Sequence, residues 1–268
     1  MNGFFERYGR MIIVAVVVCF VLLLFTPMKR TIGDNINGFV DGFANKVGDS
    51  LGTVNMPDGS DNIAKEKSST IIGTVWDKES QEDDAQFAKA IPEQATAVVF
   101  TDEVAPKGAT TTDLTVVKDG DVVGWLDGTT WKVSTQNSNK VVNFNENSSK
   151  MFYQKRSLTN IEFNNVDTSN VTDMGDMFYN CQDLTSLDLS SFDTSNVTNM
   201  RNMFFAWGRP ELTSLDLSSF NTSKVTDMED MFGCCSNLQT IKARSQTDID
   251  KLKTKSTKVD SSVKFEIA

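Results

Sequence analysis

The stretch LTSLDLSSFDTSNVTNMRNMF, residues 184–204, decides the fold, because it returns almost unchanged as LTSLDLSSFNTSKVTDMEDMF, residues 212–232. A related unit begins at Leu158, and Leu238 opens a truncated one. Units one, two and three therefore begin at Leu158, Leu184 and Leu212, and the truncated unit is the fourth. Successive units therefore start 26, 28 and 26 residues apart. Self-similarity at such a period is typical of repeat proteins whose units stack on one another, and it falls in the range of roughly 20–29 residues of leucine-rich repeats.

Each unit has two apolar halves. Leu187 and Leu189 alternate with polar residues, as in a strand. The second half has apolar residues three positions apart, which suits a short helix; they are Val197, Met200, Met203 and Phe204. One strand with one short return cannot bury its own apolar edge. The units over residues 158–243 are therefore predicted to form an α/β repeat solenoid, with a leucine-rich-repeat-like parallel sheet and short helical returns.

The region upstream of the repeat is predicted to be a β-rich entry cap, residues 93–157. Short β-branched or aromatic runs occur at 97–101, 114–118, 122–126, 130–134 and 141–144, with glycine-containing turns between them. Trp125 and Trp131 are expected to be core residues of this cap. Met151 and Phe152 lie 26 residues before Met177 and Phe178, so a degenerate unit precedes the first full one.

The last segment, residues 244–268, is predicted to be a C-terminal cap with a helix at 248–252 and a strand at 263–267, because the ends of a repeat stack need a polar cover. Residues 53–92 lack periodicity and are rich in charged and turn-forming residues, which predicts a flexible acidic linker. Residues 31–52 carry apolar side chains at helical spacing, which predicts an amphipathic juxtamembrane helix.

Residues 1–30 are expected to be a transmembrane signal anchor, with residues 11–28 in the bilayer. The unbroken apolar run from Met11 to Phe25 is flanked by basic residues on both sides and is followed by no small-residue cleavage site. A cleaved signal peptide, a lipoprotein leader using Cys19 and a pilin-type leader are the alternatives, and each fits the residues less well. Positive charge at both ends leaves the orientation open.

Composition excludes several classes of function. The chain has 268 residues, 36 acidic and 26 basic, and no histidine, so a histidine-dependent triad, general base or zinc site cannot be built. The net charge of −10 argues against a nucleic-acid partner. No motif marks a catalytic, cofactor or metal site, and we expect neither an enzyme nor a bound cofactor.

The repeat text resembles the BspA-like leucine-rich repeat surface proteins, also known as mycoplasma-lipoprotein-type repeats. The resemblance lies in SNVTDMGDMFYNC, residues 169–181, and LTSLDLSSFNTSKVTDMEDMFGCC, residues 212–235. It implies a bacterial cell-surface protein, anchored in the cell membrane by a single pass with the repeat outside. Some members of that family are adhesins for host matrix. We expect no C-terminal sorting signal after the repeat.

One exposed column is the candidate binding surface. The strand pattern places an acidic residue of each unit between the two inward leucines, with hydroxyl side chains beside it. The predicted site residues are Glu162, Asp188, Asp216, Thr185, Thr213, Ser186 and Ser214. Such a column is most simply a solvated face; the alternative is a surface for a cation such as Ca²⁺ or for a basic partner.

Other repeated positions are expected to be structural. Cys181 and Cys235 share a repeat position, where unit two has Trp207, and should be free, buried thiols. The two methionines of each unit should be core residues. Arg209 and Pro210, which lie in the two-residue insertion of unit two, should form a bulge in one coil. The resulting prediction is a surface module that binds a protein or glycan partner. The alternative is a structural component that oligomerises through residues 31–52.

Overall fold

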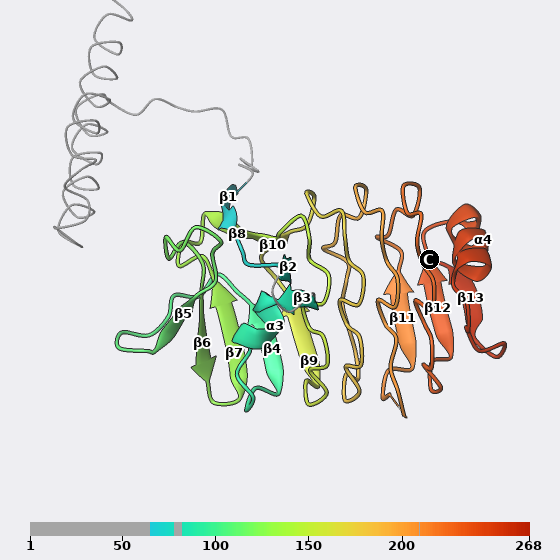
Figure 1. Cartoon of the computed structure of the whole chain (residues 1–268), viewed down its shortest axis with the longest axis horizontal. Helices are drawn as coiled ribbons and strands as arrows, with labels where there is room; N and C mark the ends of the chain where they lie inside the picture. The colour runs from blue at the N-terminus through green and yellow to red at the C-terminus, as the bar shows by residue number, and fades with distance from the viewer. Residues whose placement is uncertain (1–64, 78–81, 209) are drawn as a thin grey trace, which may run out of the picture. The chain divides into compact units, whose positions relative to one another are not determined.

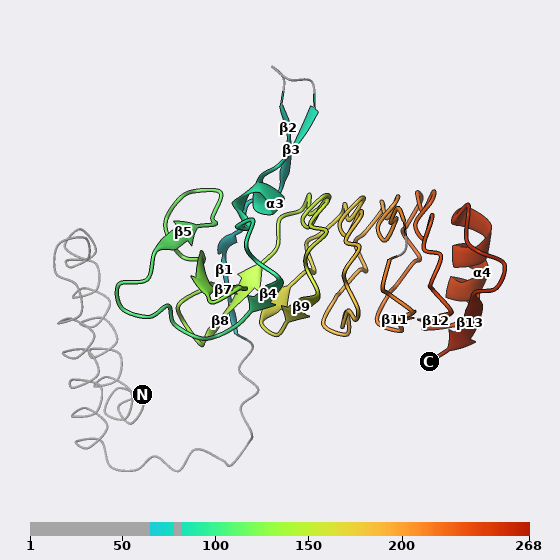
Figure 2. The same cartoon turned by 90° about the horizontal axis from the view of Figure 1, so that it is seen from below.

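The computed structural model describes residues 65–77, 82–208 and 210–268. Within them, the chain runs from a β-rich region through a series of stacked coils to a C-terminal helix, α4 (Gln246–Lys255) (Figures 1 and 2). The predicted anchor, residues 11–28, and the predicted helix at 31–52 lie outside the described residues. Among the described residues, no helix has the length and apolar character needed to cross a membrane.

The β-rich region is built on a five-stranded sheet. Its order is β5 (Thr111–Asp113), β6 (Val123–Asp127), β7 (Thr130–Ser134), β4 (Ala97–Phe100) and β9 (Asn160–Phe163). A tight turn at Gly128, whose φ of 62° suits glycine, joins β6 to β7. Trp125 and Trp131 are 2% and 1% exposed, which confirms their predicted core role. Because β4 pairs in parallel with β9 of the first repeat unit, this sheet continues into the coils.

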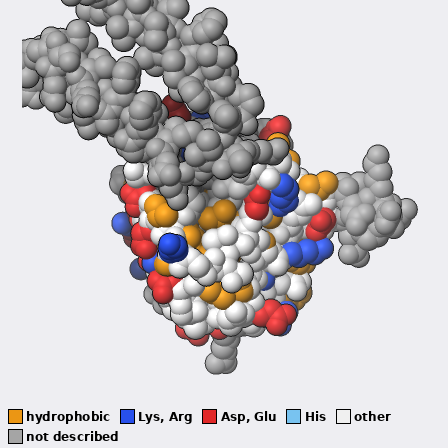
Figure 3. All heavy atoms as spheres, turned by 90° about the vertical axis from the view of Figure 1, so that its left-hand side faces the viewer, with side chains coloured by type: hydrophobic (Ala, Val, Ile, Leu, Met, Phe, Trp, Pro, Cys, Tyr) orange, Lys and Arg blue, Asp and Glu red, His pale blue; other side chains and the backbone are white. Residues whose placement is uncertain are grey.

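The strand predicted at 114–118 is wrong. The strand is β5, just upstream, and the chain then turns because the Asp113 carboxylate accepts hydrogen bonds from the backbone N–H groups of Thr115 and Gly120. Lys118 has a positive φ within this turn. On the face of the β-rich region seen in Figure 3, acidic and basic side chains are mixed with hydrophobic ones.

The predicted flexible linker is also wrong where the structure describes it. β1 (Glu66–Thr70) pairs in parallel with β8 (Lys140–Asn143), which also pairs with β10 (Val166–Asp167). β2 (Thr74–Asp77) and β3 (Glu82–Ala85) form a hairpin that leads into α3 (Gln86–Ala90). Ile71 and Phe87 are buried in the core. Local polarity misled the prediction, because the stabilising pairing lies more than 70 residues away along the chain.

The coils stack in register with the repeat. Isolated parallel bridges join Asn147 to Asp173, Asp173 to Asn199, and Asn199 to Asp227, which are the repeat-equivalent positions of four coils. We call these four residues the bridge column. Beyond it, backbone N–H groups of one coil donate to carbonyls of the next, as from Phe178 to Met203 and from Phe204 to Met231. The coil containing Asn147 is the degenerate unit expected before the first full repeat.

The expected helical returns are absent: none of the described residues between 158 and 243 is helical. Each return is a chain of turns in which Asp176, Asn202 and Asp230 have positive φ. Aspartate and asparagine tolerate that conformation better than most residues. A three-residue apolar spacing fits successive turns as well as a helix. The turns also leave backbone N–H groups free to pair with the neighbouring coil, whereas a helix would use them internally.

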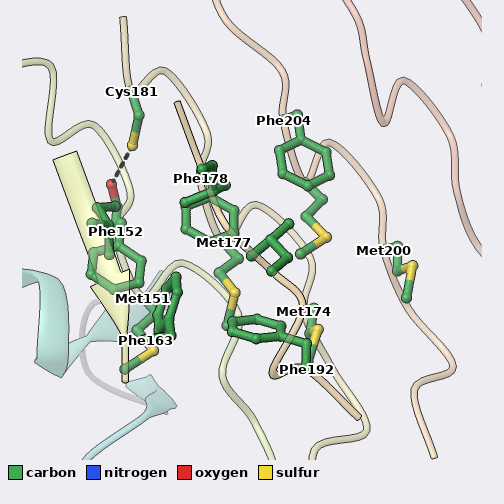
Figure 4. Packing of buried hydrophobic residues seen from close by; sticks show 14 of the residues in the cluster. Met151, Phe152, Phe163, Met174, Met177, Phe178, Cys181, Phe192, Met200 and Phe204 are labelled. Atoms are coloured by element: carbon green, nitrogen blue, oxygen red, sulfur yellow. Dashed lines mark hydrogen bonds between the residues drawn. The ribbon is translucent and has the colours of Figure 1, made fainter. Parts of the chain in front are cut away.

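Phenylalanine and methionine side chains of successive coils pack together in the core (Figure 4). Phe152, Phe178, Phe204 and Phe232 stack with ring centroids 5.4, 5.6 and 5.9 Å apart and nearly parallel planes. The paired methionines of the three full units are 0–1% exposed, as expected for core residues. Cys181 and Cys235 are buried free thiols, which confirms that prediction. Burial raises the pKa of each to about 12, so both are held in the neutral form.

The strand side is paired less evenly. β11 (Ser214–Leu217), β12 (Thr240–Ala243) and β13 (Lys264–Ile267) form a parallel sheet, but the expected strand step from Leu187 to Leu189 in unit two is not assigned as a strand. Serine hydroxyls bond there instead: Ser191 donates to the Phe163 carbonyl (3.2 Å) and Ser219 to the Leu189 carbonyl (2.9 Å).

The C-terminal segment closes the stack. Thr168, Thr194 and Thr222 are buried at equivalent positions, and the first two bond with the backbone of the following coil. After unit three that partner is the Asp248 carboxylate of α4, which accepts from the Thr222 hydroxyl (2.6 Å). Ser245 caps the helix N-terminus. One buried aspartate thus replaces the backbone of the coil that does not follow.

Candidate functional site

The predicted site residues lie on one exposed face. Glu162 is on β9, Asp216 is on β11, and Asp188 is at the equivalent position of the coil between them; we call these three the acidic row. Strand alternation explains their exposure, since the residues on either side of each, such as Ile161 and Phe163, are buried. The four hydroxyl residues of the prediction are also exposed: Thr185, Ser186, Thr213 and Ser214.

The carboxylates of the acidic row accept hydrogen bonds from neutral groups on their own coils. Asn160 and Asn164 donate to Glu162 at 2.8 and 3.2 Å. The backbone N–H of Ser190 donates to Asp188 at 2.9 Å, and that of Ser218 donates to Asp216 at 3.0 Å. Each aspartate therefore helps to close the turn that follows its strand.

The electrostatics of the row follow from these bonds. Hydrogen bonds from Ser190 hold the pKa of Asp188 below its ordinary value, although the charge of Asp216 acts in the opposite direction. Hydrogen bonds from Ser218, helped by the Lys242 ammonium group, lower the pKa of Asp216. Both carboxyl groups are therefore ionised at neutral pH. Neighbouring coils present like charges across the row, and water at this exposed face screens them.

Sequence reasoning missed the neighbours that bound the row. Lys242 of β12 pairs with Asp216, and their charged groups are 3.8 Å apart with both side chains about half exposed. On the other side, Glu162 pairs with Val99 of β4. The signal for Lys242 was present, because it stands in the truncated fourth unit at the position that Asp216 holds in the third.

The arrangement does not form a metal site within the part of the chain that the structure describes, where no group of three acidic, cysteine or histidine residues could hold an ion. Two open grooves, of about 650 and 590 Å³, lie elsewhere, and neither is lined by a predicted site residue. The acidic row can present three negative charges from successive coils on one exposed face.

On the return side of the coils, unit two differs from units one and three in the exposure of one side chain. Trp207 was placed at the repeat position of Cys181 and Cys235, which are buried, but its own side chain is 55% exposed. Pro210 of the two-residue insertion is buried. The predicted bulge at Arg209 and Pro210 lies partly outside the described residues, and the indole of Trp207 just before it is exposed.

The comparisons with known proteins place the chain by family. No curated protein and no solved structure matched it. A family model described as "Mycoplasma protein of unknown function, DUF285" matched residues 131–266, slightly more than half of the chain. The matched range begins in β7 and covers every coil and the C-terminal cap. The chain therefore belongs to the DUF285 family of mycoplasma proteins of unknown function.

Proposed function

We propose that this protein is a membrane-anchored bacterial surface module that binds macromolecules, with residues 158–243 forming a leucine-rich-repeat-like solenoid of the BspA-like type. The repeat text and its stacking in register support the solenoid. The apolar run at 11–25 and the family resemblance support a single-pass anchor in the cell membrane with the coils outside. In this proposal the protein carries out no chemistry of its own.

The acidic row is the observation that supports binding most strongly. Glu162, Asp188 and Asp216 project from successive coils at equivalent positions of the repeat. The residues around them are short hydroxyl side chains, so a partner can approach closely. A basic protein surface is the complementary partner, because opposed charge patterns steer encounter and fix orientation.

Display outside the cell is tested by protease treatment of intact cells that carry the full chain with a C-terminal epitope. The proposal predicts loss of the epitope from intact cells, while a cytoplasmic marker protein survives. An epitope that stays intact until lysis would contradict the outward orientation.

Binding through the acidic row is tested by adhesion of the same cells to surfaces coated with a lysine-rich protein. Cells with Asp188→Asn and Asp216→Asn together should adhere several-fold less, and cells with Asp183→Asn, an exposed aspartate outside the row, should adhere as the wild type does. Equal adhesion of all three would favour a purely structural surface component.

A further inference from the structure

We propose that the Trp207 indole is the anchor of a binding site for a neutral oligosaccharide on the return side of the coils. The inference rests on the proposed binding function, and it names a partner for the surface around Trp207, which is separate from the acidic row. Among the described residues of 158–243, Trp207 is the only large hydrophobic side chain recorded as exposed.

The exposed indole is held in one orientation. Its Nε1–H donates to the Tyr179 hydroxyl oxygen at 2.9 Å, and its ring meets the Phe205 ring edge to face, with centroids 5.0 Å apart at 71°. Its backbone is fixed too, because its N–H donates to the Asn180 side chain (3.2 Å) and its carbonyl accepts from Gln182 Nε2 (2.8 Å). An aromatic side chain that is fixed and half exposed is preorganised for a ligand.

The rings behind Trp207 form a continuous support. Tyr153 stacks on Tyr179 at 5.0 Å, and Tyr179 stacks on Phe205 at 5.1 Å. The next repeat position is Gly233, where a Cβ atom would lie 2.5 Å from the Phe205 ring. The glycine therefore lets coil three pack against Phe205, which in turn supports Trp207. Any side chain at Gly233 would disturb this support.

The groups around the indole are neutral and polar. The Tyr179 hydroxyl accepts from Trp207, and among the described residues it donates to no recorded acceptor, so its O–H is available. Gln182 uses its amide N–H groups on Asn180 and Trp207, and its carbonyl oxygen accepts from no described residue. One donor and one acceptor thus flank an aromatic surface.

This combination fits a sugar ring better than a protein surface. A pyranose presents an apolar C–H face that stacks on an aromatic ring, and hydroxyl groups at its rim that bond with neutral donors and acceptors. A protein partner is expected to need a wider desolvated apolar patch around its anchor residue. Trp207 is the only large exposed hydrophobic side chain among the described residues of 158–243, and its hydrogen-bond partners among the described residues are uncharged. This favours a neutral glycan over an acidic one.

The test uses the fluorescence of the full chain in a Trp76→Phe background. Since Trp125 and Trp131 are buried, a ligand-induced change then reports on Trp207. The probes are cellotriose, mannotriose and the trimer of N-acetylglucosamine. At least one should give a saturable blue shift of the emission and protect the indole from acrylamide quenching. Failure of all three would overturn the proposal.

Variants show whether the signal belongs to this site. By calorimetry, Trp207→Ala should weaken binding of the active trisaccharide at least tenfold, Trp207→Phe should weaken it less, and Val117→Ala, an exposed residue of the β-rich region, should leave it unchanged. Unchanged affinity in Trp207→Ala would overturn the site, as would capture of a protein, but no sugar, through Trp207.

The same samples separate this inference from the proposed function. Binding of a lysine-rich peptide should persist in Trp207→Ala and weaken in the Asp188→Asn and Asp216→Asn variant. Sugar binding should behave in the opposite way. If the wild type binds the peptide but none of the sugars, only the sugar site fails; if it binds a sugar but not the peptide, the acidic row fails.

Discussion

Carboxylates line both sides of the coil stack, and the two sides accommodate them differently. On the return side, the bridge column has Asn199 between Asp173 and Asp227, and its amide donates to both oxygens of Asp173 at 3.1 Å. On the strand side, the acidic row has charged residues in three successive coils, with no amide residue at the equivalent position between them. The return-side groups are half-buried, whereas the acidic row is exposed.

The bridge column and the acidic row show that stacking limits the choice of residue at half-buried positions more than at exposed ones. Like charges in adjacent coils are costly when water is partly excluded, so the half-buried column contains a neutral hydrogen-bond donor. At the exposed face water and salt screen the repulsion, and the fold tolerates three carboxylates in a row. Folding therefore demands little of the acidic row beyond the turn-closing bonds of its aspartates, which leaves it available for a partner.

The largest predicted effect concerns Asp248, the buried carboxylate that ends the return side. Asp248→Ala should lower the free energy of unfolding by about 3 kcal/mol, because it removes the carboxylate that accepts from the Ser245 hydroxyl and leaves the Thr222 donors unpaired. Chemical denaturation of the full chain measures this. Asp250→Ala, an exposed change on the same helix, should cost less than about 0.5 kcal/mol.

Acid should remove the part of this contribution that depends on the charge of Asp248. Burial opposes ionisation of Asp248, but hydrogen bonds from Ser245, Thr222 and Arg244 outweigh it and hold its pKa below the ordinary 3.8. A carboxyl group whose folded pKa is lowered stabilises the fold above pH 3.8, and that contribution disappears as the pH falls through the folded value. The wild type and Asp248→Ala should therefore converge in acid, and a constant gap would contradict the account.

Placing a third carboxylate in the bridge column should be the next largest effect. Asn199→Asp should cost about 2 kcal/mol at neutral pH, since it replaces the amide donor with a charge beside Asp173. The matched change on the exposed face is Asn164→Asp beside Glu162, which should cost less than about 0.5 kcal/mol. Equal costs for both would show that burial does not distinguish the two sides.

Removing a half-buried charge should have a smaller effect of opposite sign. Burial raises the pKa of Asp176, while its hydrogen bond from Asn202 acts against that shift. Asp176→Asn should therefore raise the free energy of unfolding slightly at neutral pH, by less than the Asn199→Asp change lowers it. The wild type should recover this difference as the pH falls through the raised folded value towards 3.8, because protonation removes the unfavourable charge. Thermal unfolding of the wild type and of Asp176→Asn at two pH values measures the stabilisation at neutral pH and its loss in acid.

The smallest effect is expected on the acidic row itself. Asp188→Asn and Asp216→Asn should each change stability by less than about 0.5 kcal/mol, because an asparagine oxygen can still accept from the backbone N–H of Ser190 or Ser218. A loss above about 1 kcal/mol in either variant would mean that the row is needed for folding.

The sequence predicted correctly which positions of the repeat are buried and which are exposed. Met200, Met203 and Cys235 are buried, and Asp188 and Asp216 are exposed, because side chains at equivalent positions of stacked coils share an environment. The prediction of helical returns was wrong, because the same sequence pattern is compatible with two backbone structures. The three-residue spacing of the returns fits a helix or successive turns, and only the positive φ at positions such as Asn202 separates them.

Non-local pairing and the insertion explain the remaining errors. The strand β1 forms because β8 offers it a parallel partner far along the chain, which no local pattern reveals. Trp207 aligns with buried cysteines, but it belongs to the 28-residue unit and its side chain is exposed. The candidate row was found from alternation alone, while its neighbour Lys242 required the truncated unit to be aligned.

The most direct test of the central claim is the affinity of the purified full chain for a lysine-rich peptide as a function of salt. The account predicts saturable binding that weakens as salt rises, and a Kd about tenfold higher for the Asp188→Asn and Asp216→Asn double variant with its stability unchanged. Equal Kd values for the wild type and the double variant would contradict it.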